Sequence, residues 1–343
     1  MIVRAIRLWR PAPSICLSAQ KFSSSWSPTT SLQDLELALT AAVQTRSYQQ
    51  IPDILNSAGD HCRNPSIFSF LAGFPERSRT QIVHEILRSL AYLRPRSRNG
   101  TAYSCLLFHT LRGSDPFPLS LAILQRTLRS GCIPFPYVGK LLSTVWLEHC
   151  RDQSSIAEIF LSMNLIGYSP CTGTCNYVVW SLCAADQLEE AMTVLKGMNG
   201  AGCIPDSDTY GSIICRMCDT RRCSDAVVML KKMFKSGLMP REETVKKVAA
   251  ALKINGEARK GIEMIELLEK EEFSVGLETY EMIAEGCLKG NEHILAAKAV
   301  MLMTKRRFIP HIKVRQKVVE GLASIGEFGL LHAIRQRLTE LGS

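Results

Sequence analysis

The chain has 343 residues, of which 46% are hydrophobic and 21% charged, and its mean hydropathy is +0.04. This composition is typical of a globular protein and excludes a disordered chain, a collagen and a coiled-coil rod. No apolar run reaches the roughly 18 residues that a membrane-spanning helix needs. Aromatic residues make up only 7%, and Leu, Ala, Met, Lys and Glu dominate the second half, which predicts an all-α protein.

The net charge of +9 is unevenly distributed along the chain. The first 30 residues contain four basic residues and no acidic ones, and residues 231–343 contain 20 basic and 15 acidic residues. The long segment between them is therefore near neutral. Because almost half of the excess lies in the first 30 residues, the net charge alone does not indicate a nucleic-acid surface.

Residues 1–22 are predicted to be a mitochondrial transit peptide. Arg4, Arg7 and Arg10 alternate with apolar residues, so a helix here would have one basic and one apolar face. A Ser-rich stretch follows, and the first acidic residue is Asp34. An Arg-rich, Ser-rich and acid-poor amphipathic leader is typical of organelle import. The early arginines favour the mitochondrion, with the plastid as the alternative, and cleavage is expected near Phe22.

Residues 31–99 are expected to form divergent helical repeats. They divide into two stretches whose lengths match a unit that repeats farther along the chain, although they carry little of its signature. The next two stretches carry more of that signature, because each ends in a glycine followed three residues later by a proline. The four stretches are 31–65, 66–99, 100–135 and 136–171.

From Thr172 onward the sequence repeats every 35 residues. Threonine stands at the third position of four consecutive blocks, a small residue recurs at the twentieth position, and a proline usually comes near the end. Agreement in several columns without an insertion defines repeat units. The blocks are 172–206, 207–241, 242–276, 277–311 and 312–343, the threonines are Thr174, Thr209, Thr244 and Thr279, and the small residues include Ala191, Ala226 and Ala296.

Each block is predicted to fold as two amphipathic helices. In block 207–241 the apolar residues of the first half, from Tyr210 to Met217, are spaced i, i+3, i+4, i+7, and the second half repeats this spacing from Ala226 to Met233. The fifteenth position often holds a residue that tolerates the left-handed conformation at a helix end. These residues are Gly256, Asn291 and Gly326.

The pattern resembles the pentatricopeptide repeat family of plant organelles, in its plain 35-residue form. Block 172–206 is the best match, and the resemblance covers 100–343 well and 31–99 loosely. The tetratricopeptide pattern fits less well, since its bulky aromatic signature is absent. The resemblance implies a right-handed α-solenoid, in which neighbouring helix pairs stack to bury a core that no single pair can bury. The matching residues are Asn176, Cys183, Ala191, Met198, Gly202, Pro205 and Asp206.

The resemblance also implies a ligand, single-stranded RNA, which the family reads one base per repeat. The reading residues are the fifth and the last of each repeat, and Asn176 with Asp206 fits the family's uracil-preferring combination. Three blocks have an acid at the second position, where the family usually has an apolar residue, and these acids would repel a phosphate chain. The combinations that depart from the family's are Ser104 with Phe135, Lys140 with Cys171, Gly211 with Arg241, Lys246 with Gly276, and Glu281 with His311.

Two further clusters are candidates for phosphate contacts and for a zinc site. Lys305, Arg306 and Arg307 end a predicted helix and are candidates for phosphate contacts, although cations there also complement the helix dipole. Cys215 and Cys218 have a spacing that zinc ligands use. No second CxxC follows, however, so we expect neither a metal site nor a cofactor. The 13 cysteines are expected to be thiols in a reducing compartment.

No phosphate loop, GxSxG or HExxH motif is present, and we expect no enzyme activity. Two functions remain open. The first is an organelle adaptor that binds single-stranded RNA and acts in RNA processing, stability or translation. The alternative is a helical scaffold that binds RNA-processing or ribosomal proteins, which the acids at the second position favour.

Overall fold

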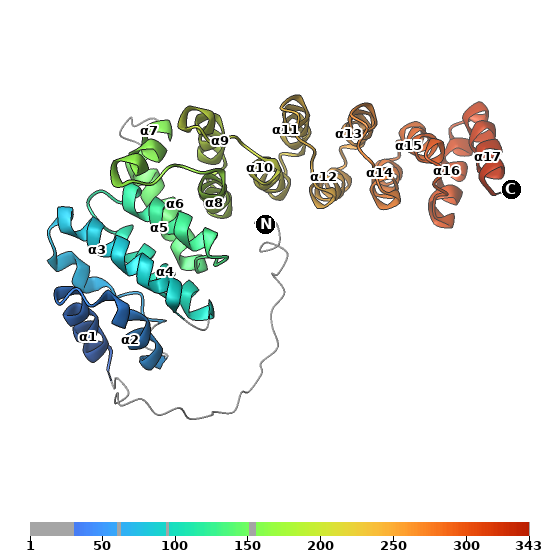
Figure 1. Ribbon diagram of the computed structural model, residues 1–343. Coiled ribbons are helices and arrows are strands. Elements are labelled where there is room, and N and C mark those ends of the chain that lie inside the picture. The colour runs from blue at the N-terminus through green and yellow to red at the C-terminus, as the bar shows by residue number, and fades with distance from the viewer. Residues whose placement is uncertain (1–30, 60–62, 94–95, 151–155, 343) are drawn as a thin grey trace, which may run out of the picture. The chain divides into compact units, whose positions relative to one another are not determined.

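The computed structural model describes residues 31–59, 63–93, 96–150 and 156–342 (Figure 1). These residues form α-helices and short 3-10 helices, and no strand is found among them, which confirms the all-α prediction. None of the described helices is long and apolar enough to cross a membrane. The predicted transit peptide lies outside the described residues.

The chain divides into two compact units, an N-terminal unit that ends at Ile204 and a C-terminal unit that begins at Pro205. The N-terminal unit contains α1 (Leu32–Gln44), α2 (Ile51–Ser57), α3 (Glu76–Ser89), α4 (Arg96–Thr110), α5 (Phe117–Arg129), α6 (Pro136–Cys150), α7 (Ile156–Leu161), α8 (Thr172–Ala184) and α9 (Leu188–Gly197). The C-terminal unit contains α10 (Ser207–Asp219), α11 (Cys223–Lys235), α12 (Glu242–Asn255), α13 (Ala258–Lys270), α14 (Leu277–Lys289), α15 (His293–Lys305), α16 (Ile312–Ser324) and α17 (Phe328–Gly342).

The C-terminal unit is a regular stack of helix pairs. Its first helices, α10, α12, α14 and α16, pack on one another in chain order, and its second helices, α11, α13, α15 and α17, form the other layer (Figure 1). The first helices begin at the first residue of each 35-residue block. The sequence period is therefore the period of the helix pairs.

The turn between the two helices of a block has the same backbone conformation in five consecutive blocks. The fifteenth residue is left-handed in all of them, with φ between 58° and 77°. This confirms the turn prediction at Gly256, Asn291 and Gly326, and the same conformation occurs at Asp186 and Arg221, whose residue types did not reveal it.

The twentieth position lies where two helices cross. Ala191, Ala226 and Ala296 are all fully buried there, as the period predicts. Block 242–276 has Gly261 at this position, and a Cβ atom on it would lie 2.9 Å from Cδ1 of Ile283. An added methyl group would therefore require the Ile283 side chain to shift, because well-packed interiors leave little free space.

The N-terminal unit is less regular. Among the described residues of the stretch 66–99, α3 is the one complete α-helix, and a 3-10 helix at Ser69–Gly73 precedes it. Pro65 and Pro75 flank that short helix, and each lacks an amide donor, so a second full α-helix has no room. Helix α4 begins at Arg96, four residues before the expected start of block 100–135.

Candidate nucleic-acid interface

The fifth and ninth residues of a block are one helical turn apart and therefore lie on the same side of its first helix. We call this side the first-helix face. In the N-terminal unit it belongs to α4, α6 and α8, which pack in that order. In the C-terminal unit it belongs to α10, α12, α14 and α16. The structure shows what occupies each predicted reading position on this face.

Ser104 is removed from the surface. Its side chain is completely buried in α4, donates a hydrogen bond to the carbonyl oxygen of Gly100 at 2.6 Å, and accepts one from the amide of Phe135 at 3.1 Å. Both hydrogen-bonding functions of the hydroxyl are thus used within the chain. It has no exposed atom with which to contact a base.

Glu281 makes the same kind of contact in the C-terminal unit. Its Oε1 accepts a hydrogen bond from the amide of His311 at 2.6 Å. His311 is the N-cap of α16, and its Nδ1 accepts a weak, 3.4 Å hydrogen bond from the amide of Lys313. In two blocks, therefore, the fifth side chain caps the backbone at the last residue of its own block.

Asp206 forms a capping box at the start of α10. Its Oδ1 accepts hydrogen bonds from the amides of Asp208 at 2.9 Å and Thr209 at 3.0 Å, while the hydroxyl of Thr209 accepts one from the amide of Asp206. A cap of this kind contributes about 1 kcal/mol to stability. Asp206 therefore has a structural role whatever ligand it also contacts.

Two other reading positions of the C-terminal unit carry cations held by carboxylates. Arg241 forms an ion pair with Asp208, whose pKa is raised by burial and only partly lowered by the guanidinium. Lys246 lies between Glu242 at 3.1 Å and Glu278 at 2.8 Å, and hydrogen bonds to these two carboxylates raise its pKa. At these two positions the positive charge is therefore already neutralised by carboxylates.

The residues at the remaining fifth positions differ in how exposed their side chains are. Gly211 is buried, and a Cβ there would meet Oγ1 of Thr244 at 3.4 Å. Asn176 lies half-buried on α8. Lys140 is exposed on α6, and it forms no ion pair in the described part of the chain.

The proposed phosphate contacts lie at the end of α15, a second helix. Lys305, Arg306 and Arg307 are exposed, and Arg307 is left-handed with φ 62°. Nε of Arg306 lies 3.8 Å from Oε1 of Glu269, which also accepts a 2.6 Å hydrogen bond from the hydroxyl of Tyr280. The cluster thus belongs partly to an internal network and is not part of the first-helix face.

The N-terminal unit adds aromatic side chains that the sequence reasoning did not select. Trp180, the ninth residue of block 172–206, is 44% exposed on α8 and packs on Tyr177 with ring centroids 5.4 Å apart. On the neighbouring helices, Phe108 and Tyr137 are half-buried and their centroids are 5.6 Å apart. Attention to the ninth position, and not only to the fifth and last, could have found Trp180.

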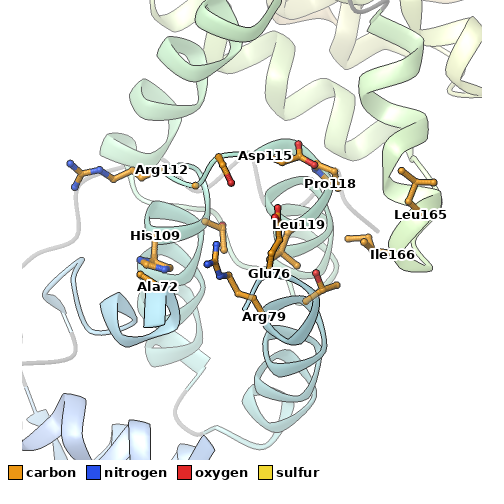
Figure 2. Close-up of a pocket in the computed structure, with 14 residues that line it drawn as sticks. Ala72, Glu76, Arg79, His109, Arg112, Asp115, Pro118, Leu119, Leu165 and Ile166 are labelled. Atoms are coloured by element: carbon orange, nitrogen blue, oxygen red, sulfur yellow. The ribbon is translucent and has the colours of Figure 1, made fainter. Parts of the chain in front are cut away.

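A cavity of about 370 Å³ lies in the N-terminal unit at the turn between α4 and α5. Figure 2 shows Arg79 of α3 directed toward His109 of α4, with Glu76 and Asp115 close by, whereas Arg112 extends away from them. Burial lowers the pKa of His109, and Arg79 and Arg112 lower it further, while burial and Glu76 raise the pKa of Asp115. Because cations and carboxyl groups balance one another, the cavity favours no single class of ligand.

The cysteines behave as small core residues. Burial raises the pKa of Cys218 to about 12 and that of Cys287 to about 11, so both are thiols at neutral pH. Within the described residues, no group of three or more metal-binding side chains lies close enough together to hold a metal ion.

Comparison with known proteins identifies the repeats. Residues 170–219 match the sequence profile of the PPR repeat family. A pentatricopeptide repeat-containing protein of Arabidopsis thaliana is 50% identical over 164 residues, which are 48% of this chain and 48% of that protein. The match thus spans about half the length of the curated relative.

Solved structures of the same class are also similar. The pentatricopeptide repeat protein PPR10 from maize has a TM-score of 0.41 and 18% identity, over 91% of this chain and 49% of that one. The PPR domain of protein-only RNase P 1 from Arabidopsis thaliana, solved in complex with tRNA, has a TM-score of 0.32 and 21% identity, over 54% of this chain and 98% of that one. The two sequence matches thus make part of the chain similar to pentatricopeptide repeat proteins, and its helix pairs recur with the same 35-residue period.

Proposed function

We propose that the protein binds single-stranded RNA on the first-helix face of its N-terminal unit. It would act there by occupancy rather than catalysis, in the processing, stability or translation of an organelle transcript. The match of residues 170–219 to the PPR repeat family supports an RNA ligand, since repeats of this kind read single-stranded RNA one base per repeat. The charges of this face favour the N-terminal unit, because no carboxylate in the described part of the chain pairs with Lys140.

The residue at the fifth position of block 172–206 gives the strongest support for RNA binding. Block 172–206, which lies wholly within the stretch that matches the family, has a polar amide at its fifth position, Asn176, which is half-buried on α8. An amide presents both a donor and an acceptor, which is what recognition of a base edge requires. We propose Asn176 as the base-selecting residue of the N-terminal unit, whereas Asp206, the last residue of the block, belongs to the C-terminal unit and stays a candidate from the sequence alone.

The test is fluorescence anisotropy of short labelled RNAs with the full chain at several salt concentrations. We expect oligouridylate to bind more tightly than oligoadenylate, and Asn176→Ala to reduce the difference by about 2- to 10-fold, the equivalent of one or two lost hydrogen bonds. Asp206→Ser is the companion variant, because serine keeps the helix cap while removing the carboxylate. A wild-type chain that binds no RNA more tightly than about 10 μM at moderate salt, the range of non-specific association, would overturn the proposal.

Protein binding by the C-terminal unit is the second candidate function. The observation that favours it is the alternation of paired charges on its first-helix face, at Asp208 with Arg241 and at Lys246 with Glu278. A mixed-charge surface complements another protein better than it complements a polyanion. Glu278→Lys distinguishes RNA binding from protein binding at this face. The variant should bind RNA more tightly if RNA contacts this face, and it should weaken a protein complex if a protein contacts it.

We also propose that the chain acts in mitochondria, with the plastid as the alternative. The support is the Arg-rich, acid-poor leader of the sequence. Deletion of residues 1–22 from a fluorescently tagged chain should leave it in the cytosol. Import of the shortened chain would contradict the assignment of the leader.

A further inference from the structure

The geometry points to a base-stacking platform at Trp180, and we infer that one nucleobase of a bound RNA stacks on its indole ring beside the base read at Asn176. The inference rests on the proposed RNA-binding function and adds a contact at the ninth position of the block. It assigns this position a binding role distinct from hydrogen-bond reading.

The indole ring is both exposed and held in place. Trp180 is 44% exposed, whereas Trp146 on the preceding first helix is 1% exposed and belongs to the core. Tyr177 supports the Trp180 ring from its own helix, with centroids 5.4 Å apart and planes inclined by 42°. An exposed ring with restrained orientation loses little conformational freedom on binding, which favours a stacking contact.

The neighbouring helix α6 approaches the ring at a glycine. A Cβ atom on Gly139 would lie 3.5 Å from Cζ3 of Trp180 and 3.5 Å from the hydroxyl oxygen of Tyr177. An added methyl group would make ordinary van der Waals contact with both side chains, so the indole lies beside α6 at this point. One edge of the ring is fixed between two helices while the rest of its surface is open to solvent.

The position of the ring relative to the proposed reading residue follows from helix geometry. Asn176 and Trp180 are four residues apart on α8, so their side chains lie on the same side of the helix about one turn apart. A base that reaches the Asn176 amide therefore passes close to the indole ring. Stacking on aromatic side chains is a general mode of single-strand recognition.

The charge next to the ring suits a polyanion. Lys140, which follows Gly139 in the chain, is exposed and carries no ion pair within the described residues. Its counterpart at the fifth position of block 242–276 is Lys246, which two glutamates hold. The ninth positions of the C-terminal unit also lack an aromatic ring, since they are Cys215, Ala250, Glu285 and Glu320.

The experiment compares Trp180→Leu with Trp180→Phe in the full chain, using labelled oligouridylate. Leucine keeps an apolar side chain against Tyr177 but has no π face, whereas phenylalanine keeps one. We expect Trp180→Leu to weaken binding about 5- to 100-fold and Trp180→Phe by less than about 3-fold, the range found for single base–aromatic stacks. The dependence on salt should be unchanged in both variants, because no charge is removed.

An abasic series of the same RNA identifies the stacked base. At one position, removal of the base should weaken binding by the wild type but not weaken it further in Trp180→Leu. Binding should also quench the tryptophan fluorescence of the wild type but not that of Trp180→Phe. Equal thermal unfolding curves for the variants show that the fold is retained.

Two results separate the inference from the proposed function. If the wild type binds RNA and Trp180→Leu, folded like the wild type, binds within about 2-fold of it, the stacking inference is overturned and the RNA-binding proposal stands. If Trp180→Leu unfolds, the tryptophan fluorescence of the wild type tests the inference instead. Fluorescence that is not quenched when the protein is saturated with RNA overturns it. If the wild type binds no RNA, both fail together.

Discussion

The two units use equivalent positions of the same repeat in different ways. At the fifth position the N-terminal unit presents Lys140, which has no ion pair with any described residue, while the C-terminal unit holds Lys246 between Glu242 and Glu278. At the ninth position the N-terminal unit has Phe108 and Trp180, and the C-terminal unit has no aromatic residue. At the fifth and ninth positions, one unit thus has an exposed lysine and aromatic rings, and the other has a lysine held by two glutamates and no aromatic ring.

The difference shows that a shared repeat period does not determine which charges and rings the surface presents. Stacked helix pairs place fifth residues next to the second residues of neighbouring blocks, so a cation opposite an acid forms an ion pair instead of meeting a ligand. Exposed pairs such as Lys246 with Glu278 contribute little stability. Their consequence is electrostatic, since they remove the local positive potential that would attract phosphate.

The largest expected effect comes from overpacking the helix crossing of each unit. Ala191→Phe in the N-terminal unit and Ala226→Phe in the C-terminal unit should each destabilise the chain by about 1–3 kcal/mol, because both alanines are fully buried. Urea unfolding measures this loss. Under native conditions only Ala191→Phe should weaken RNA binding. An equal loss of affinity in both variants would contradict the claim that RNA binds to the N-terminal unit alone.

Removal of the helix cap at Asp206 should have the next largest effect. Asp206→Ala should lower the free energy of unfolding by about 0.5–2 kcal/mol, and Asp206→Ser by only a few tenths, because serine can accept the same amide hydrogen bonds. Thermal unfolding compares the two variants. If the two variants lose the same free energy of unfolding, Asp206 does not stabilise the chain through its capping box.

A matched pair of lysine variants tests the electrostatic contrast directly. Lys140→Gln should reduce the slope of log affinity against log salt by about 0.7, the value for one phosphate contact with a single strand, and Lys246→Gln should leave it unchanged. Replacing Lys305, Arg306 and Arg307 together by Gln extends the test to the end of α15. A reduced slope for Lys246→Gln or for this triple variant would place RNA on the C-terminal unit.

The smallest expected effect is a pH dependence of the N-terminal unit. Because burial, Arg79 and Arg112 lower the pKa of His109 below its usual 6.5, the unfolded chain binds the proton more tightly than the folded chain. Stability should therefore fall as the pH decreases through about 6.5 and recover as it rises again. His109→Gln should remove this part of the dependence, as measured by unfolding at a series of pH values, and an unchanged dependence would contradict the assignment.

Much of the fold was predictable from the sequence, because the 35-residue period fixes where each helix pair begins. The left-handed turns at Asp186 and Arg221 were not, since these residue types also occur in many other conformations. The burial and ion pairing of the predicted reading positions were less predictable than the fold. Ion pairs such as Arg241 with Asp208 depend on how neighbouring helices pack, and the burial of Ser104 depends on the packing of α4, neither of which a one-dimensional pattern contains.

The measurement that tests the central claim most directly is the mapping of zero-length photocrosslinks between the full chain and an RNA containing 4-thiouridine. Mass spectrometry of the digested complex identifies the crosslinked peptides. The account predicts crosslinks in α6 and α8, centred on the peptides that contain Lys140 and Trp180. Crosslinks confined to residues 207–311, or none at RNA concentrations that saturate binding, would contradict it.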